Sequence, residues 1–305
     1  MLLLHLNYAL GENLTVETLS LPALRIQGQA ARAHTQGLEI ANGKYYVTAR
    51  RDDVLPRRGL LLRTSPTATD WDVWDITPLD AVGGVTALDH PGGMQSDGQR
   101  LWIPLAESRR KGRSVIRAFP IEDMSPGRPL KSGFEFTVDD HIGAVAISAG
   151  RNLIFGANWD TEAVYVWDFK GRLLRTLDPT ELRDRELGVV SGSGNRPGLA
   201  VQDWKMVDDR LFASGLFRPA SGTAASPQSR LMIFTDFLER GFQRQTITLP
   251  VQQKTELAHE AMAVSGGLVY FLPEDLGAIN RVFRVSVADL MKQSSQPILR
   301  PANAP

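Results

Sequence analysis

The chain has 305 residues, of which 43% are hydrophobic, so it can bury a core without disulfides or structural metals. Its 34 Lys and Arg residues balance 34 Asp and Glu residues, which argues against a general nucleic-acid binder or a polybasic membrane protein. Cysteine is absent, which excludes thiolate metal sites and a cysteine nucleophile. No apolar run reaches the ~20 residues that a membrane helix needs.

The first ten residues are apolar but carry no basic residue, since the first Arg or Lys is Arg25. They are either the trimmed remnant of an export signal or a first strand. The compartment therefore stays open between the cytoplasm and secretion with the signal removed.

Five segments of the chain resemble one another. Each begins with a polar residue, usually histidine, and continues through two apolar stretches joined by a turn rich in Gly, Asn, Asp or Ser. The segments start near His34, His90, His141, Gln202 and His259, at intervals of roughly 56 residues. They cover nearly the whole chain, which indicates a repeat architecture.

Within each segment a turn pair predicts a β-hairpin. The pairs are Asn42-Gly43, Asp97-Gly98, Ala149-Gly150, Asp208-Asp209 and Gly266-Gly267. Further strand-like stretches follow each hairpin, so a unit holds about four short strands, the pattern of a propeller blade. We therefore predict an all-β fold, a five-bladed β-propeller. A sandwich or another number of blades is the alternative.

The two ends of the chain predict how the ring closes. Residues 14–22 look like a strand but precede the first repeat, and no clear fourth strand follows Val285 in the last repeat. We expect the N-terminal strand to complete the last blade. A closed ring cannot be divided into independent halves, so residues 1–305 are expected to form one domain.

Four of the five histidines occupy the same position of the repeat, and His5 is the exception. In a propeller the first strand of each blade lines the central channel, so equivalent side chains point toward the axis. Three residues further on, Gly37, Gly93 and Ala144 are small, as a crowded axis requires. We expect His34, His90, His141 and His259, together with Gln202, to hold a divalent transition metal such as Mn, Fe or Zn.

Two alternatives to the metal site stay open. The histidines could hydrogen-bond water and backbone in a solvated channel, or their alignment could be accidental. In the fourth repeat the neighbouring frame would place Val201 or Asp203, instead of Gln202, in the ring.

The second strands of the blades end on the same face and surround the histidines with polar side chains. The candidate catalytic residues there are Arg50, Glu107, Asp160, Arg218 and Glu274. Other residues at these strand ends are Arg51, Asp52, Arg109, Asn158, Trp159, Phe217 and Asp275. Asp139, Asp140 and Glu260 flank two of the histidines and are expected to orient them. Each alone is most simply a solvated surface group, but together they predict a small-molecule site.

The positive charge expected at the site limits the class of substrate. Neutral ligands leave a divalent ion its full charge, and Arg50, Arg51 and Arg218 would add to it. An anionic or enolising substrate is favoured, with the ion polarising it or activating bound water.

The repeat of histidine followed by a small residue and a hairpin, in the versions HTQGLE, HPGGMQ and HEAMAV, resembles an uncharacterised family of β-propeller proteins of unknown function. More loosely, the chain is similar to metal-centred propeller lyases such as oligogalacturonate lyase, in which histidines and a glutamine hold manganese. This second resemblance implies a ligand role for the four repeat histidines and Gln202. That enzyme has more blades, so its substrate and catalytic residues do not carry over. Carotenoid-cleaving oxygenases are similar only in their set of four histidine ligands.

The predicted function is that of a metal-dependent lyase or hydrolase acting on a small polar or anionic molecule. An oxidative enzyme with histidine-bound iron is the other catalytic candidate. A non-catalytic propeller that binds a ligand or a protein through the same face is the alternative of a different class. It would need clustered exposed aromatic residues, of which this face offers Trp159 and Phe217.

Overall fold

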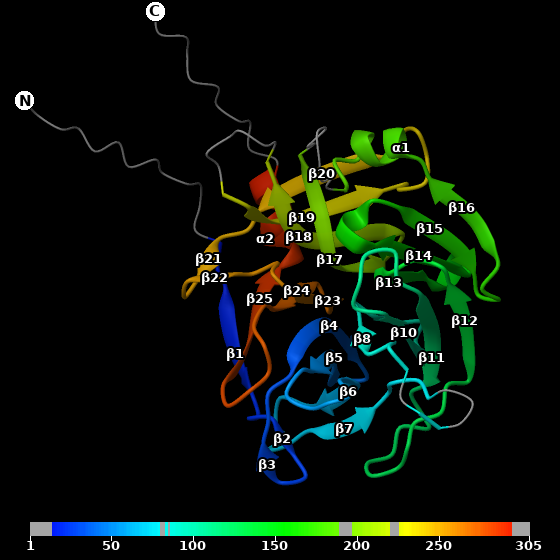
Figure 1. Cartoon of the computed structure of the whole chain (residues 1–305). Coiled ribbons are helices and arrows are strands. Elements are labelled where there is room, and N and C mark those ends of the chain that lie inside the picture. The colour runs from blue at the N-terminus through cyan, green and yellow to red at the C-terminus, as the bar shows by residue number, and fades with distance from the viewer. Residues whose placement is uncertain (1–13, 80–82, 85, 189–196, 220–225, 295–305) are drawn as a thin grey trace, which may run out of the picture.

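Each of the five repeats folds into an antiparallel sheet, and the five sheets form the ring of a five-bladed β-propeller (Figure 1). The structure, a computed structural model, describes residues 14–79, 83–84, 86–188, 197–219 and 226–294. His5 and the rest of the apolar N-terminal stretch lie outside these residues. The predicted fold class is confirmed.

The blades follow one another along the chain. Blade one consists of β4 (His34–Ala41), β5 (Lys44–Arg51), β6 (Arg58–Thr64) and β7 (Asp72–Asp75). Blade two consists of β8 (His90–Pro91), β9 (Gln95–Ser96), β10 (Arg100–Ala106), β11 (Ser114–Pro120) and β12 (Phe134–Val138), and both β8 and β9 pair with β10. Blade three consists of β13 (Ile142–Ser148), β14 (Leu153–Asn158), β15 (Val164–Asp168) and β16 (Leu173–Leu177).

Blade four consists of β17 (Gly198–Val207), β18 (Arg210–Arg218), β19 (Gln228–Thr235) and β20 (Gln243–Thr248). Blade five consists of β23 (Ala261–Ser265), β24 (Leu268–Leu272), β25 (Asn280–Ser286) and β1 (Glu17–Leu21). Two small hairpins add β2 (Arg25–Ile26) with β3 (Gln29–Ala30), and β21 (Val251–Gln252) with β22 (Thr255–Glu256). The helices are η1 (Ala149–Arg151), η2 (Trp159–Thr161), α1 (Pro179–Asp184) and α2 (Val287–Ser294). None of the described helices is long and apolar enough to cross a membrane.

The N-terminal strand closes the ring. In Figure 1, β1 lies beside β25, and the two strands pair in antiparallel register from Glu17 opposite Arg284 to Leu21 opposite Asn280. Glu17 and Arg284 also form an ion pair. Because β1 comes from the opposite end of the chain, blade five joins the two ends of the fold, as the sequence predicts.

The predicted hairpin turns are found where the inner two strands of a blade meet. Asn42 and Gly43 join β4 to β5 with φ values of 51° and 69°, a left-handed conformation that asparagine and glycine adopt more readily than other residues. Asp208 and Asp209 between β17 and β18 are also left-handed. The turn at Ala149-Gly150 differs, because it takes the form of the short helix η1.

The hydrophobic core is divided into five clusters, and each cluster is shared by two neighbouring blades. Examples are Leu61 with Ile103, Trp102 with Ile154, Phe155 with Trp204, Phe212 with Phe271, and Tyr45 with Tyr270. Packing both faces of every sheet against its neighbours removes apolar surface from water all around the ring. The face at the strand ends is thereby left free to carry polar side chains.

Candidate functional site

The histidines lie at the start of the innermost strands, on one face of the ring. His34 is opposite Arg50 in the β4–β5 register, and His90 is opposite Ala106 in the β8–β10 register. The ends of the second strands therefore flank the histidines, as the hairpin geometry predicts.

A β-bulge in the innermost strands decides which residues are equivalent. The register shifts between Thr35 and Gly37 in blade one, and between Val201 and Asp203 in blade four. Gln202 is therefore the extra residue of a bulge and corresponds to Gln36. It does not occupy the position of His34, which in blade four belongs to Ala200.

The histidine of blade five, His259, is also displaced from the repeat position that His34 occupies. The inner hairpins of blades one and five end at the pairs Ala41–Lys44 and Ser265–Leu268, and this register makes Leu38 equivalent to Met262. The amides of both residues donate to Asp203 Oδ2, at 3.2 and 3.0 Å. His34 lies four positions before Leu38, whereas His259 lies three positions before Met262. Strict equivalence therefore holds for three histidines, in blades one, two and three.

Asp203 lies near the axis. Its carboxylate accepts hydrogen bonds from backbone amides of blades one, four and five and from Lys205 Nζ. The inner strands approach so closely that a Cβ at Gly93 would lie 2.5 Å from Asp203 Oδ1. Gly93 and Ala144 also form a parallel bridge between blades two and three. The expectation of small residues at the axis is thus confirmed.

Asp203, Lys205 and Glu39 form an axial cluster of buried ionisable groups. Burial raises the pKa of Glu39 to about 8, although the nearby Lys205 opposes this shift. Glu39 Oε2 has no hydrogen-bond partner among the residues that the structure describes. The hydrogen bonds to Asp203 link blades one, four and five at the point where the sequence predicts a ligand from blade four.

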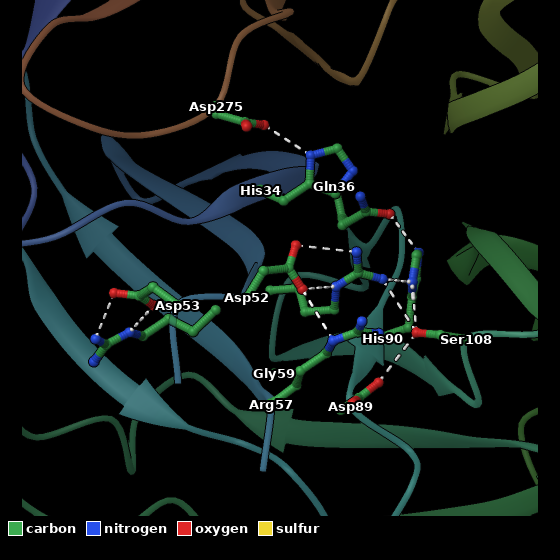
Figure 2. Close-up of polar contacts among 12 residues, drawn as sticks. His34, Gln36, Asp52, Asp53, Arg57, Gly59, Asp89, His90, Ser108 and Asp275 are labelled. Atoms are coloured by element: carbon green, nitrogen blue, oxygen red, sulfur yellow. Dashed lines mark hydrogen bonds and ion pairs between the residues drawn. The ribbon is translucent and has the colours of Figure 1, made fainter. Parts of the chain in front are cut away.

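His90 is enclosed by donors and acceptors at the mouth of the channel (Figure 2). Arg50 Nη1 lies 2.6 Å from His90 Nδ1, and because arginine can only donate, Nδ1 must accept. His90 Nε2 then carries the proton and donates to Gln36 Oε1 at 2.8 Å. Burial, together with the nearby His141 and Arg50, holds the pKa of His90 well below its usual range. Both ring nitrogens of this neutral histidine are already used.

His141 is packed more deeply. Its Nδ1 donates to the carbonyl oxygen of Glu107 at 2.8 Å, and its ring lies 5.2 Å from His90 and 4.7 Å from Trp159 between centroids. Burial lowers its pKa. The carboxylate of Asp140 accepts from the backbone amide of His141 instead of from its ring. The expected orienting role of Asp140 is therefore replaced by the Glu107 carbonyl, and Asp139 is exposed.

His34 and His259 line one cavity of about 620 Å³ between blades one and five. His34 Nδ1 lies 2.7 Å from Asp275 Oδ1, and His259 Nδ1 lies 3.1 Å from Glu260 Oε1 (Figure 2 shows the first pair). The Glu260 carboxylate raises the pKa of His259 because it stabilises the protonated ring. Glu260 thus orients its histidine as expected, and Asp275 is the matching carboxylate for His34.

The loop after β24 positions Asp275 and Glu274 beside blade one. Leu276 and Ala33 exchange two backbone hydrogen bonds, and Thr35 Oγ1 donates to the carbonyl oxygen of Glu274 at 2.8 Å. Glu274 also lines the cavity, but its carboxylate is held by Arg281. The contact between His34 and Asp275 therefore depends on a segment from the opposite end of the repeat array.

The other charged rim residues are paired among themselves. Arg50 binds Asp52 at 2.7 Å, and Glu107 pairs with Arg109 at 2.6 Å. Asp160 pairs with Arg110 at 2.6 Å and lies 3.8 Å from Arg218. Arg51 pairs with Asp53 in the same way. The sequence predicts an anionic substrate from the charges of Arg50, Arg51 and Arg218. Neighbouring carboxylates largely neutralise these charges.

The geometry does not assemble the predicted four-histidine metal site. Within the described part of the chain, no group of three or more His, Asp or Glu side chains is arranged to hold an ion. His90 would have to release Arg50 or Gln36 to become a ligand, and the guanidinium beside it would repel a cation. His34 and His259, each with a carboxylate on Nδ1, are the two histidines that fit a metal better.

Part of the chain matches a known protein family. Residues 71–221 match a family of unknown function, DUF6454. The DUF6454 match spans the last strand of blade one, blades two and three and the first two strands of blade four. It includes His90 and His141 but neither His34 nor His259. No curated protein matches the chain.

Solved structures resemble the chain at low sequence identity. A protein of unknown function from Bacteroides thetaiotaomicron is 12% identical, with a TM-score of 0.48, over 90% of this chain and 77% of that one. A GH43 glycoside hydrolase engineered for endo-xylanase and exo-arabinofuranosidase activity is 12% identical, with a TM-score of 0.52. The alignment covers 88% of this chain and 51% of the hydrolase, so this chain spans about half the length of that enzyme. At such identities these similarities concern the fold alone.

Proposed function

We propose that the protein is an acid–base enzyme, a lyase or hydrolase, that acts on a small polar molecule in the cavity between blades one and five. The observation that carries this proposal is that two histidines, each paired with its own carboxylate, line one cavity. A volume of about 620 Å³ is in the range of small-molecule sites.

His34 is suited to act as the general base. Its Nδ1–H donates to Asp275, so in the neutral ring the lone pair is on Nε2. When Nε2 takes a proton from the substrate, the carboxylate of Asp275 stabilises the imidazolium that forms. Thr35 and Ala33, which tie the chain beside His34 to the Asp275 loop, keep this pair aligned.

His259 is suited to act as the general acid. The hydrogen bond that its ring donates to Glu260 raises the pKa of His259, so the ring keeps its proton to a higher pH than an ordinary histidine. With 54% of its side chain exposed, it is accessible to a substrate in the cavity. A base and an acid in one cavity are the groups that a lyase needs to remove one proton and protonate a leaving group.

A metal-assisted version of the same site is the second candidate. A carboxylate on Nδ1 is also what orients histidines that bind metals through Nε2. His34 and His259 would hold the ion, water or substrate would complete its coordination, and the ion would supply Lewis-acid chemistry. This arrangement replaces the predicted ring of four histidines and Gln202.

The test combines elemental analysis with an activity screen of the purified full chain. Wild type and His34→Gln, His259→Gln and Asp275→Asn variants are assayed against panels of lyase and hydrolase substrates. Asp53→Asn is the matched control, because Asp53 is a rim carboxylate that pairs with Arg51 away from the cavity. Turnover that is lost in the three cavity variants and kept in the control supports the proposal.

Elemental analysis separates the two versions of the mechanism. Near-stoichiometric Mn, Fe or Zn that is lost in a His34→Gln, His259→Gln double variant would establish the metal-assisted form. Activity without bound metal would establish acid–base chemistry by the side chains alone. Turnover that survives in His34→Gln would contradict both, and ligand binding without turnover would favour the non-catalytic alternative.

A further inference from the structure

Arg32 lines the same cavity, two residues before the proposed base His34. Among the residues that the structure describes, no hydrogen bond or ion pair engages its guanidinium. Arg281, the other arginine of the cavity, is held by Glu274. Arg50 and Arg51 on the neighbouring rim are likewise paired with aspartates. Arg32 is therefore a cation whose hydrogen-bond donors are free for a ligand.

The backbone around Arg32 is fixed although its side chain is exposed. Ala31 and Ala33 on either side are buried, at 8% and 2% exposure. Ala31 donates to the carbonyl oxygen of Leu24 at 3.1 Å, and Ala33 exchanges two hydrogen bonds with Leu276. Because the backbone is anchored on both sides, binding a ligand costs Arg32 mainly side-chain entropy.

The carboxylates of the cavity do not compete for this guanidinium. Asp275 accepts from His34, Glu260 from His259, and Glu274 from Arg281. With His259 protonated, the cavity holds three cations and three carboxylates, and Arg32 is the cation without a carboxylate contact. A single free positive charge among carboxylates fits a monoanion better than a dianion, because a second negative charge would be repelled.

Two of the residues that line the cavity are apolar. Ile279 is 76% exposed and lines the cavity together with Pro273. An exposed isoleucine at the edge of a charged cavity offers a contact for the hydrocarbon part of a ligand.

We propose that the cavity selects a small organic monocarboxylate, whose carboxylate forms a bidentate pair with Arg32 and whose hydrocarbon part packs on Ile279. Arginine is suited to this role because its planar donors match the two oxygens of a carboxylate. The inference rests on the proposed function for the chemistry at His34, but it predicts binding independently of turnover. It also replaces Arg50, Arg51 and Arg218 as the predicted source of anion selectivity.

The experiment measures binding by amide chemical shifts on the full chain. The probes are butyrate, hexanoate and octanoate, each compared with its primary amide, and inorganic phosphate. Carboxylates are expected to shift the amides of Ala33 and Leu276, whereas the matched amides and phosphate are not. Arg32→Gln should weaken carboxylate binding about tenfold or more, since a charge-assisted pair is lost. Arg32→Lys should retain part of it.

Arg172→Gln is the control for net charge, because Arg172 is exposed and pairs with Asp168 in blade three. It should bind the carboxylates as wild type does. Equal binding by wild type and Arg32→Gln, equal binding of acids and amides, or no binding of any carboxylate would each overturn the inference. His34→Gln should bind carboxylates normally, so failure of the catalytic proposal alone would leave this binding result intact.

Discussion

His90 and His34 begin equivalent strands of neighbouring blades, yet their surroundings differ completely. His90 is half-buried, neutral and bonded through both ring nitrogens to Arg50 and Gln36. His34 is 31% exposed, is held through Nδ1 by Asp275 and faces a cavity. The same residue at the same repeat position is thus a structural element of the channel mouth in one blade and a candidate base in the next.

The axial cluster of Asp203, Lys205 and Glu39 extends this contrast. Its hydrogen bonds to Asp203 link blades one, four and five, whereas the charged groups of the cavity between blades one and five are mostly exposed or half-buried. We therefore expect changes at the axis to alter stability and changes in the cavity to alter activity.

The largest expected effect is on activity. His34→Gln should lower turnover about one hundred-fold to ten thousand-fold, the usual contribution of a general base. Its free energy of unfolding should change by less than about 1 kcal/mol, because the side chain is partly exposed and its partner is solvated. Steady-state kinetics and urea unfolding measure the two quantities. A large loss of stability with unchanged turnover would reverse the proposed roles of the two regions.

The largest expected effect on stability is at the axis. Asp203→Ala removes the acceptor of three backbone amides and leaves Lys205 buried without its carboxylate. The expected cost is about 3–5 kcal/mol, measured by urea unfolding. Asp53→Ala is the control, since Asp53 is 44% exposed and pairs with Arg51, and it should cost less than about 1 kcal/mol. Similar losses in both variants would contradict a special role for the axis.

The pH dependence of stability should have opposite signs at His90, at the mouth of the channel, and at His259, in the cavity. The folded-state pKa of His90 lies below its unfolded value near 6.5, so below that pH the unfolded chain binds a proton that the native state excludes. His90 therefore lowers the free energy of unfolding as the pH falls below 6.5, by up to about 1.4 kcal/mol per pH unit. His259 has a raised pKa, so its contribution is present below pH 6.5 and is lost as the pH rises through the folded value.

Unfolding curves between pH 5 and pH 8 test this difference. His90→Asn should flatten the acid side of the profile, and His259→Asn should flatten the side above pH 6.5. The same slope in wild type and His90→Asn would show that this histidine is not held neutral.

A third pH effect concerns a single buried carboxyl group. Glu39 has a folded pKa of about 8 against 4.5 in the unfolded chain, so it costs stability progressively as the pH rises between these values. Glu39→Gln removes this titration, and its advantage over wild type should increase from pH 5 to pH 8. An advantage that does not change with pH would show that Glu39 is ionised throughout this range.

Much of the fold could be predicted from local patterns. Turn pairs such as Asn42-Gly43 favour left-handed conformations through their own residue types, and apolar stretches between turns form strands. The small residues Gly93 and Ala144 indicate the crowded axis, and the unpaired strand at residues 14–22 indicates how the ring closes. These features depend on neighbouring residues or on the repeat itself.

The site was less predictable. The bulge at Gln202 shifts the inner strand of blade four so that Asp203, not Gln202, lies near the axis, and sequence alone leaves both frames open. Arg32 was missed because nothing in its local sequence separates it from other surface arginines.

The sequence by itself determined the repeat, the blades and the face that carries the histidines, because these follow from periodicity and turn chemistry. Only the tertiary structure decided the hydrogen-bond partners and the burial of each histidine. Asp275 contacts His34 from 241 residues away, and Arg50 of blade one contacts His90 of blade two. Hydrogen bonds and burial set the protonation and accessibility of an imidazole, and both depend on side chains that the closed ring brings together from distant parts of the chain.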